Sequence, residues 1–89
     1  MDRESLRKDL AELVEQETGA KPGNLADDVL LIEGLGMDSI DLVGLVVQVE
    51  NRFGIKIATE ELRGVSKVGD FLGLVEKKIS ARDAETANA

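Results

Sequence analysis

The sequence predicts an all-α fold, a small four-helix bundle with three longer helices, one short third helix and a long first loop. Apolar residues recur with the helical period in three segments of the 89-residue chain. Glycine, proline and asparagine separate these segments, as expected where helices end. Ile55 and Ile57 alternate with polar residues too briefly to indicate a strand. We therefore expect helices packed around one core, anchored by the two aromatic residues, Phe53 and Phe71.

The first helix is predicted from Arg3 to Thr18. Polar and charged residues fill most of its positions, and one face is apolar, with Leu6, Leu10, Leu13 and Val14. Gly19 stands where a left-handed C-terminal cap is needed, and Pro22 follows as a residue that does not comfortably continue a helix. The helix is therefore expected to end at Gly19.

A long connection is predicted from residue 20 to residue 38. It carries more apolar side chains than a solvated linker, namely Leu25, Val29, Leu30, Leu31, Ile32 and Leu35. A loop of this length in a small domain is uncommon unless it is functional or contains a helical turn. We expect it to pack against the bundle, with Gly34 and Gly36 marking a tight approach to Asp38 and Ser39.

The second helix is predicted from Ser39 to Arg52, and its apolar residues form two stripes where a surface helix needs one. The first stripe suits the core and contains Leu42, Leu45, Val46, Val49 and Phe53. The second stripe lies roughly 140° away on a helical wheel and contains Ile40, Val43 and Val47. This second stripe needs a partner protein, a bound chain or another helix, and packing against the first connection is the alternative.

Two more helices are predicted in the second half of the chain. Thr59 is expected to cap a short third helix that ends near Gly64, with Glu60 and Glu61 in its first turn. Ser66 is expected to cap the fourth helix, whose apolar residues keep the helical period: Val68, Phe71, Leu72, Val75 and Ile79. The pattern therefore predicts one short helix and one longer helix here.

The chain has room for one domain, to which we assign residues 1 to 82. Residues 83 to 89 lack apolar periodicity and are predicted to form a disordered C-terminal tail. The 18 acidic and 11 basic residues give a formal charge of -7, which disfavours nucleic acid and anionic membranes as partners. The chain has no apolar run of about 18 residues and no secretory signal, so we expect a cytoplasmic protein.

Cysteine and histidine are both absent from the sequence. Their absence removes disulfides, thiolate nucleophiles, zinc-type ligand sets and the commonest general base. Carboxylates could still perform acid–base chemistry, but they would need a pocket that perturbs their pKa values. We therefore predict no catalytic residues and no metal site.

Ser39 follows Asp38 at the start of the second helix. On its own, a serine at a helix start is most simply an N-cap whose hydroxyl accepts a backbone hydrogen bond. Its surroundings, however, closely resemble the attachment motif of acyl carrier proteins, and they read Leu35-Gly36-Met37-Asp38-Ser39-Ile40-Asp41-Leu42. The resemblance covers roughly residues 5 to 80 and includes Glu33, Phe53-Gly54-Ile55-Lys56-Ile57 and Val68-Gly69-Asp70-Phe71.

The resemblance implies a free-standing acyl carrier protein with the helical bundle of that family. It implies that Ser39 carries 4'-phosphopantetheine, transferred from coenzyme A by a phosphopantetheinyl transferase. The arm would hold acyl intermediates as thioesters and deliver them to enzymes of polyketide, other secondary-metabolite or fatty-acid biosynthesis. The implied partners are an acyl-loading ligase or acyltransferase and synthases with basic patches, and the carrier is expected to be a monomer.

The same resemblance gives the residues around Ser39 a role in recognition. It implies that Asp38 and Asp41 contact basic patches on partner enzymes, whereas Asp27 and Asp28 are more simply interpreted as a solvated acidic loop. The second stripe is expected to dock partners between acidic residues. The predicted docking set is Asp38, Ile40, Asp41, Val43, Val47 and Glu50.

The second helix departs from the family pattern at three positions. Gly44 stands where the family commonly has Glu, and Asn51 and Arg52 stand where it has acidic residues. A glycine inside a helix costs about 1 kcal/mol relative to alanine, so we expect a close approach there by a partner or by the carried chain. The weaker acidity favours a specialised pathway such as polyketide synthesis over housekeeping fatty-acid synthesis.

Two other functions are consistent with the sequence. One is an acidic helical module for protein–protein interaction that carries no prosthetic group, and its partner binding would survive loss of Ser39. The other is an enzyme that uses the carboxylates of Glu33, Asp38 and Asp41, which would show turnover by the isolated chain.

Overall fold

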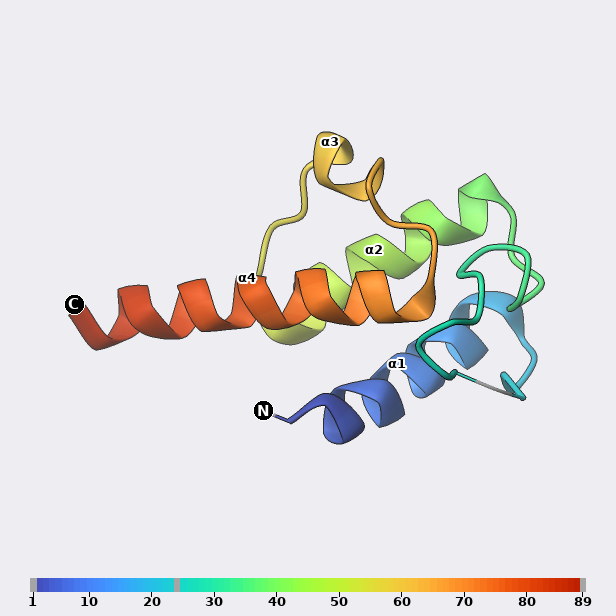
Figure 1. Ribbon diagram of the computed structural model, residues 1–89, viewed down its shortest axis with the longest axis horizontal. Helices are drawn as coiled ribbons and strands as arrows, with labels where there is room; N and C mark the ends of the chain where they lie inside the picture. Colours follow the sequence, from blue (N-terminus) through green and yellow to red (C-terminus); the bar gives the residue numbers. More distant parts are fainter. Residues whose placement is uncertain (1, 24, 89) are drawn as a thin grey trace.

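The computed structural model describes residues 2–23 and 25–88. Within these ranges the chain forms four helices and no strand: α1 (Arg3–Thr18), α2 (Ser39–Phe53), α3 (Thr59–Leu62) and α4 (Val68–Asn88). Figure 1 shows α4 along the long axis of the molecule, with α1 on one side of it and the short α3 on the opposite side. The predicted all-α bundle with a short third helix is therefore confirmed.

The bounds of α1 agree with the prediction because the residues next to each end determine where the helix begins and ends. Asp2 has an extended backbone and caps the helix, since its side chain accepts a hydrogen bond of 2.8 Å from the amide of Ser5. Gly19 closes the helix in the left-handed conformation, with φ of 78°, and its N–H donates to the carbonyl of Glu15. Glycine is favoured at this position because it adopts positive φ without strain.

The core contains residues from three of the helices and from the loops between them. Phe71 has no exposed surface, and Phe53 is 8% exposed, so both aromatic residues are buried as predicted. No polar or charged residue is buried in the part of the chain that the structure describes. The remaining core side chains are Leu6, Leu10, Leu13, Val14, Leu25, Leu31, Met37, Leu45, Val46, Val49, Ile55, Ile57, Val68, Leu72, Val75 and Ile79.

The first connection is held against the start of α4 by backbone hydrogen bonds. The amide of Leu31 donates to the carbonyl of Ser66 at 2.9 Å, and the amide of Val68 donates to that of Val29 at 2.8 Å. Leu25 and Leu31 are buried. The prediction that this connection packs on the bundle is therefore confirmed, and some of its backbone groups pair with residues at the start of α4 or just before it.

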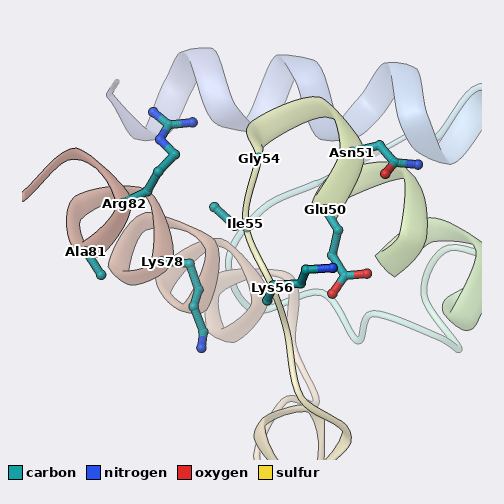
Figure 2. A pocket seen from close by; sticks show the side chains of 8 residues that line it. All are labelled: Glu50, Asn51, Gly54, Ile55, Lys56, Lys78, Ala81 and Arg82. Atoms are coloured by element: carbon teal, nitrogen blue, oxygen red, sulfur yellow. The ribbon is translucent and has the colours of Figure 1, made fainter. Parts of the chain in front are cut away.

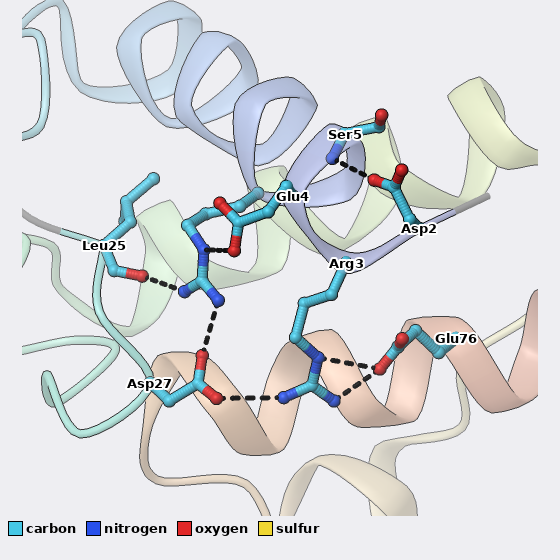
Figure 3. A network of polar contacts seen from close by, with 8 residues as sticks. Asp2, Arg3, Glu4, Ser5, Leu25, Asp27 and Glu76 are labelled. Carbon is cyan, nitrogen blue, oxygen red and sulfur yellow. Dashed lines mark hydrogen bonds and ion pairs between the residues drawn. The ribbon is translucent and has the colours of Figure 1, made fainter.

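A network of ion pairs fastens the same connection to α1 and α4 (Figure 3). The carboxylate of Asp27 is shared by two side chains of α1, Arg7 at 2.8 Å and Arg3 at 3.0 Å, and Arg3 also pairs with Glu76 of α4. The hydrogen bond from Arg7, reinforced by Arg3, lowers the pKa of Asp27. Asp27 is exposed, as expected for a solvated acidic loop, but it is also paired with α1, which the sequence did not predict.

The caps of the two later helices differ from those predicted. The amide of Ala58 donates to Glu61 at 2.9 Å, so α3 is entered through Ala58 and Thr59 is its first helical residue. At the start of α4, the carboxylate of Asp70 accepts from the amides of Ser66 and Lys67 at 3.2 and 3.1 Å. These amides, that of Lys67 first, lower the pKa of Asp70. Thr59 and Ser66 are therefore not the helix caps, because nearby carboxylates satisfy the amides instead.

The last helix is longer than the sequence predicted. α4 continues through Asn88, where a disordered tail was expected for residues 83 to 89; Ala89 lies outside the described residues. No glycine or proline interrupts the sequence between Ser80 and Asn88, so nothing breaks the backbone hydrogen bonds of the helix. The missing apolar periodicity after residue 82 therefore did not indicate the end of the helix. No helix in the described ranges is long and apolar enough to cross a membrane.

Candidate functional site at the start of α2

Asp38 caps α2 and leaves Ser39 as the first residue inside the helix. The backbone of Asp38 is extended, and its Oδ1 accepts a hydrogen bond of 2.8 Å from the amide of Asp41. The carboxylate of Asp41 accepts in return from the amide of Asp38 at 3.3 Å, which completes a capping box. The alternative interpretation of Ser39 as the N-cap is therefore wrong.

Ser39 is consequently available for chemistry. The residue is exposed, and its hydroxyl has no hydrogen-bond partner in the part of the chain that the structure describes. The amides of Ser39 and Ile40 also have no acceptor there, as expected in the first turn of a helix. An exposed hydroxyl beside open amides at the positive end of a helix suits a side chain that is to carry a phosphate group.

The backbone before Ser39 is held in place by the buried Met37 and by two glycines that allow tight turns. The side chain of Met37 is buried, and its amide donates to the carbonyl of Ile32 at 2.9 Å. Gly36 turns the chain with φ of 67°, a conformation that glycine adopts most readily. Gly34 permits a close approach of the backbone, because a Cβ there would lie 2.5 Å from the carbonyl oxygen of Leu30. Ser39 therefore projects from an anchored segment.

The second apolar stripe of α2 faces solvent. Ile40 is 80% exposed, Val43 62% and Val47 48%, whereas Leu45, Val46, Val49 and Phe53 on the first stripe are buried. The stripe is thus not packed against the first connection, so that alternative is wrong. Exposed aliphatic residues grouped next to Ser39 form the kind of surface that partner proteins cover.

The acidic residues of the predicted docking set do not all lie in the same environment. Asp38 and Asp41 flank Ser39 and face each other across the capping box. Glu50 lies about 16 Å from Ser39 along the helix axis, at 1.5 Å per residue. Its carboxylate accepts a hydrogen bond of 2.8 Å from the amide of Ile57, so it holds the connection that leads to α3.

The sequence reasoning missed a contact between α1 and α2. The carboxylate of Glu17 lies over Gly44, and the side-chain amide of Gln48 donates to it. The close approach expected at Gly44 is therefore made by α1 within the same chain. Arg52 is likewise held by α1, through Glu12 at 3.1 Å and Asp9 at 3.9 Å. The mid-helix glycine was the only signal of this contact, and it did not indicate which residue would approach.

Two hollows lie on α2 or beside it. The first, of about 530 Å³, is lined by residues at the end of α2 and on α4 (Figure 2): Glu50, Asn51, Gly54, Ile55, Lys56, Lys78, Ala81 and Arg82. It lies at the opposite end of α2 from Ser39. The second, of about 190 Å³, is nearer to Ser39 and is lined by Leu30, Leu31, Ile32, Glu33, Leu42, Val65 and Ser66. Neither hollow contains the exposed hydroxyl.

Comparison with known proteins agrees with this geometry. A family model described as the phosphopantetheine attachment site matches residues 8–75. The chain is 33% identical to an acyl carrier protein of Rhodococcus erythropolis, over 98% of this chain and 94% of that protein. It is 31% identical to a meromycolate extension acyl carrier protein of Mycobacterium tuberculosis, over 98% of this chain and 75% of that protein.

A solved structure resembles the fold as well. The crystal structure of an acyl carrier protein from Thermotoga maritima superimposes with a TM-score of 0.81 at 31% sequence identity. The match covers 91% of this chain and 94% of that one. Sequence and structure therefore agree over nearly the full length.

Proposed function

The chain belongs to the acyl carrier protein family, the family of the phosphopantetheine attachment site, and from this premise we propose that Ser39 carries the 4'-phosphopantetheine arm. The observation that supports this choice is that Asp38, and not Ser39, caps α2. Because Asp38 caps α2, the hydroxyl of Ser39 is exposed and has no partner among the described residues.

The attachment is a phosphoryl transfer from coenzyme A. The Oγ of Ser39 attacks the phosphorus next to the pantetheine, an Oγ–P bond forms, and the P–O bond to the adenosine 3',5'-diphosphate leaving group breaks. The hydroxyl proton passes to a base of the transferase. The product is a phosphodiester whose single negative charge lies at the positive end of α2.

The arm, when attached, supplies the thiol that this cysteine-free chain lacks. Acyl groups are held on it as thioesters, and the protein delivers them to partner enzymes. Tethering gives the acyl group a high effective concentration at each active site, so the protein contacts themselves can be weak. We propose that the carrier acts as a cytoplasmic monomer and that Asp38, Asp41 and the exposed stripe contact its partners.

The relatives favour acyl-chain extension as the pathway. Several of them are named as meromycolate extension acyl carrier proteins of mycobacteria, and others simply as acyl carrier proteins. We therefore propose a role in fatty-acyl or meromycolate-type chain extension, in place of the polyketide pathway that the sequence of α2 favoured. Its partners are the loading enzyme, the transferase and the synthases of that pathway.

The proposal is tested by intact-mass spectrometry. The purified protein is incubated with coenzyme A, Mg²⁺ and a broad-specificity phosphopantetheinyl transferase. The wild type and Ser66→Ala, which changes another exposed serine near a helix start, should each gain one phosphopantetheinyl group. Ser39→Ala should gain none. A wild-type mass unchanged with several transferases would instead support an interaction module without a prosthetic group.

A further inference from the structure

We propose that Glu17 of α1 is a specificity-determining residue of the docking surface on α2. The surface fits a partner enzyme that presents a lysine or arginine beside an apolar patch. This inference rests on the proposed carrier function, because it assigns a further residue to the surface that surrounds the attachment site. It is carried by three observations on the α1–α2 contact.

The first observation is the position of the carboxylate. A Cβ at position 44 would stand 2.7 Å from Oε1 of Glu17 and closer still to the other atoms of that carboxylate. Such a distance is too short for a real contact, so a side chain at position 44 would displace the carboxylate, and the glycine leaves room for it in this place. The side chain of Gln48, one turn further along α2, donates to the same carboxylate and holds it there.

The second observation is where Gly44 lies on the helix. At 100° per residue, Gly44 is roughly 40° from Ile40 and roughly 60° from Val47 around the axis of α2, and Gln48 lies next to it on the flank towards α1. Gly44 therefore separates the exposed stripe from α1. A carboxylate that reaches over it from α1 forms the edge of the stripe.

The third observation is the absence of charged residues on the middle turns of α2. Between Asp41 and Glu50, α2 contains no ionisable residue. Arg52, the basic residue of α2, is paired with α1. The charge beside the middle of the stripe is thus supplied by Glu17, and a basic side chain is its complement.

One partner can contact Ser39 and Glu17 together. Gly44 is five residues after Ser39, or about 7.5 Å along the helix axis. A protein interface of ordinary size buries about 800 Å² on each partner, which extends well beyond this distance. An enzyme that reaches the arm at Ser39 and covers Ile40, Val43 and Val47 therefore also meets Glu17.

The test uses a phosphopantetheinyl transferase whose docking surface carries lysine or arginine beside an apolar patch. Glu17→Gln removes the charge and keeps an oxygen that can accept the hydrogen bond from Gln48. Its matched control is Glu15→Gln, which makes the same charge change at an exposed position about 200° around α1. The double variant Glu17→Ala/Gly44→Glu removes the carboxylate from α1 and places one on α2, at position 44.

The measured quantity is kcat/KM for modification of Ser39 at low and at high salt. We expect Glu17→Gln to lower kcat/KM about three- to fivefold at low salt, as for an exposed charge pair, and to flatten the salt dependence. Glu15→Gln should behave like the wild type, and the double variant should regain most of the lost rate. Thermal unfolding of each variant, which should stay close to the wild type, separates docking from folding.

The outcomes distinguish the two proposals. If the wild type is not modified at all, the carrier function fails and this inference fails with it. If the wild type is modified, the carrier function stands. In that case the inference is overturned if Glu17→Gln matches Glu15→Gln in kcat/KM and salt dependence, or if the carboxylate at position 44 restores nothing.

Discussion

Replacing Asp38 by alanine should destabilise the protein through the loss of one helix cap. The Oδ1 of Asp38 accepts the amide of Asp41 at 2.8 Å, and alanine offers no acceptor. Loss of an N-cap of this kind costs about 1 kcal/mol, within a range of about 0.5 to 2. For a domain of this size each kcal/mol lowers the melting temperature by about 4–8 °C, so a drop of that order is expected for Asp38→Ala.

The matched variant is Asp38→Asn, because asparagine caps a helix about as well as aspartate does. Urea denaturation followed by circular dichroism gives the free energy of unfolding of each protein. Asp38→Asn should lie within about 0.5 kcal/mol of the wild type and Asp38→Ala about 1 kcal/mol below it. Equal stabilities for the two variants would refute the assignment of Asp38 as the cap, and with it the reason why Ser39 is available.

Three further changes test the fold. Gly34→Ala should cost about 1–3 kcal/mol because its Cβ meets backbone, whereas Gly23→Ala has open space and should be nearly neutral in the same urea titration. Leu45→Ala, in a fully buried position, should cost about 2–5 kcal/mol; a smaller loss would contradict its place in the core. Asp27→Asn should lower the melting temperature at pH 7. Because Arg7 lowers the pKa of Asp27 below its ordinary 3.8, the difference from the wild type should vanish as the pH falls well below that value; a constant difference would contradict the ion pair.

The parts of the fold that the sequence predicted are those determined by neighbouring residues. The bounds of α1 follow from its own apolar period and from Gly19, and both agree with the structure. The two apolar stripes of α2 could also be read from its sequence, although the structure was needed to show that Ile40 and Val43 are exposed and not packed against the first connection. These inferences need no knowledge of how the helices pack.

The predictions failed where two residues could satisfy the same backbone amides or where a contact depends on how two helices pack. Asp38 and Ser39 are both good caps, and the sequence alone does not decide which of them the helix uses. At the start of α4, likewise, the carboxylate of Asp70 in the first turn accepts the hydrogen bonds, and the hydroxyl of Ser66 is not the cap. The contact of Glu17 with Gly44 depends on where α1 crosses α2, which no local pattern encodes.

The central claim is that Ser39 is the attachment site, and the most direct measurement is tandem mass spectrometry of the protein purified from the cells that make it. Trypsin should release residues 9 to 52 as one peptide, because Pro22 protects the bond after Lys21. In that peptide Ser39 is the only serine and Thr18 the only threonine. We predict one phosphopantetheinyl group, with fragment ions that place it on Ser39. A peptide that is entirely unmodified, or a group placed on Thr18, would contradict the claim.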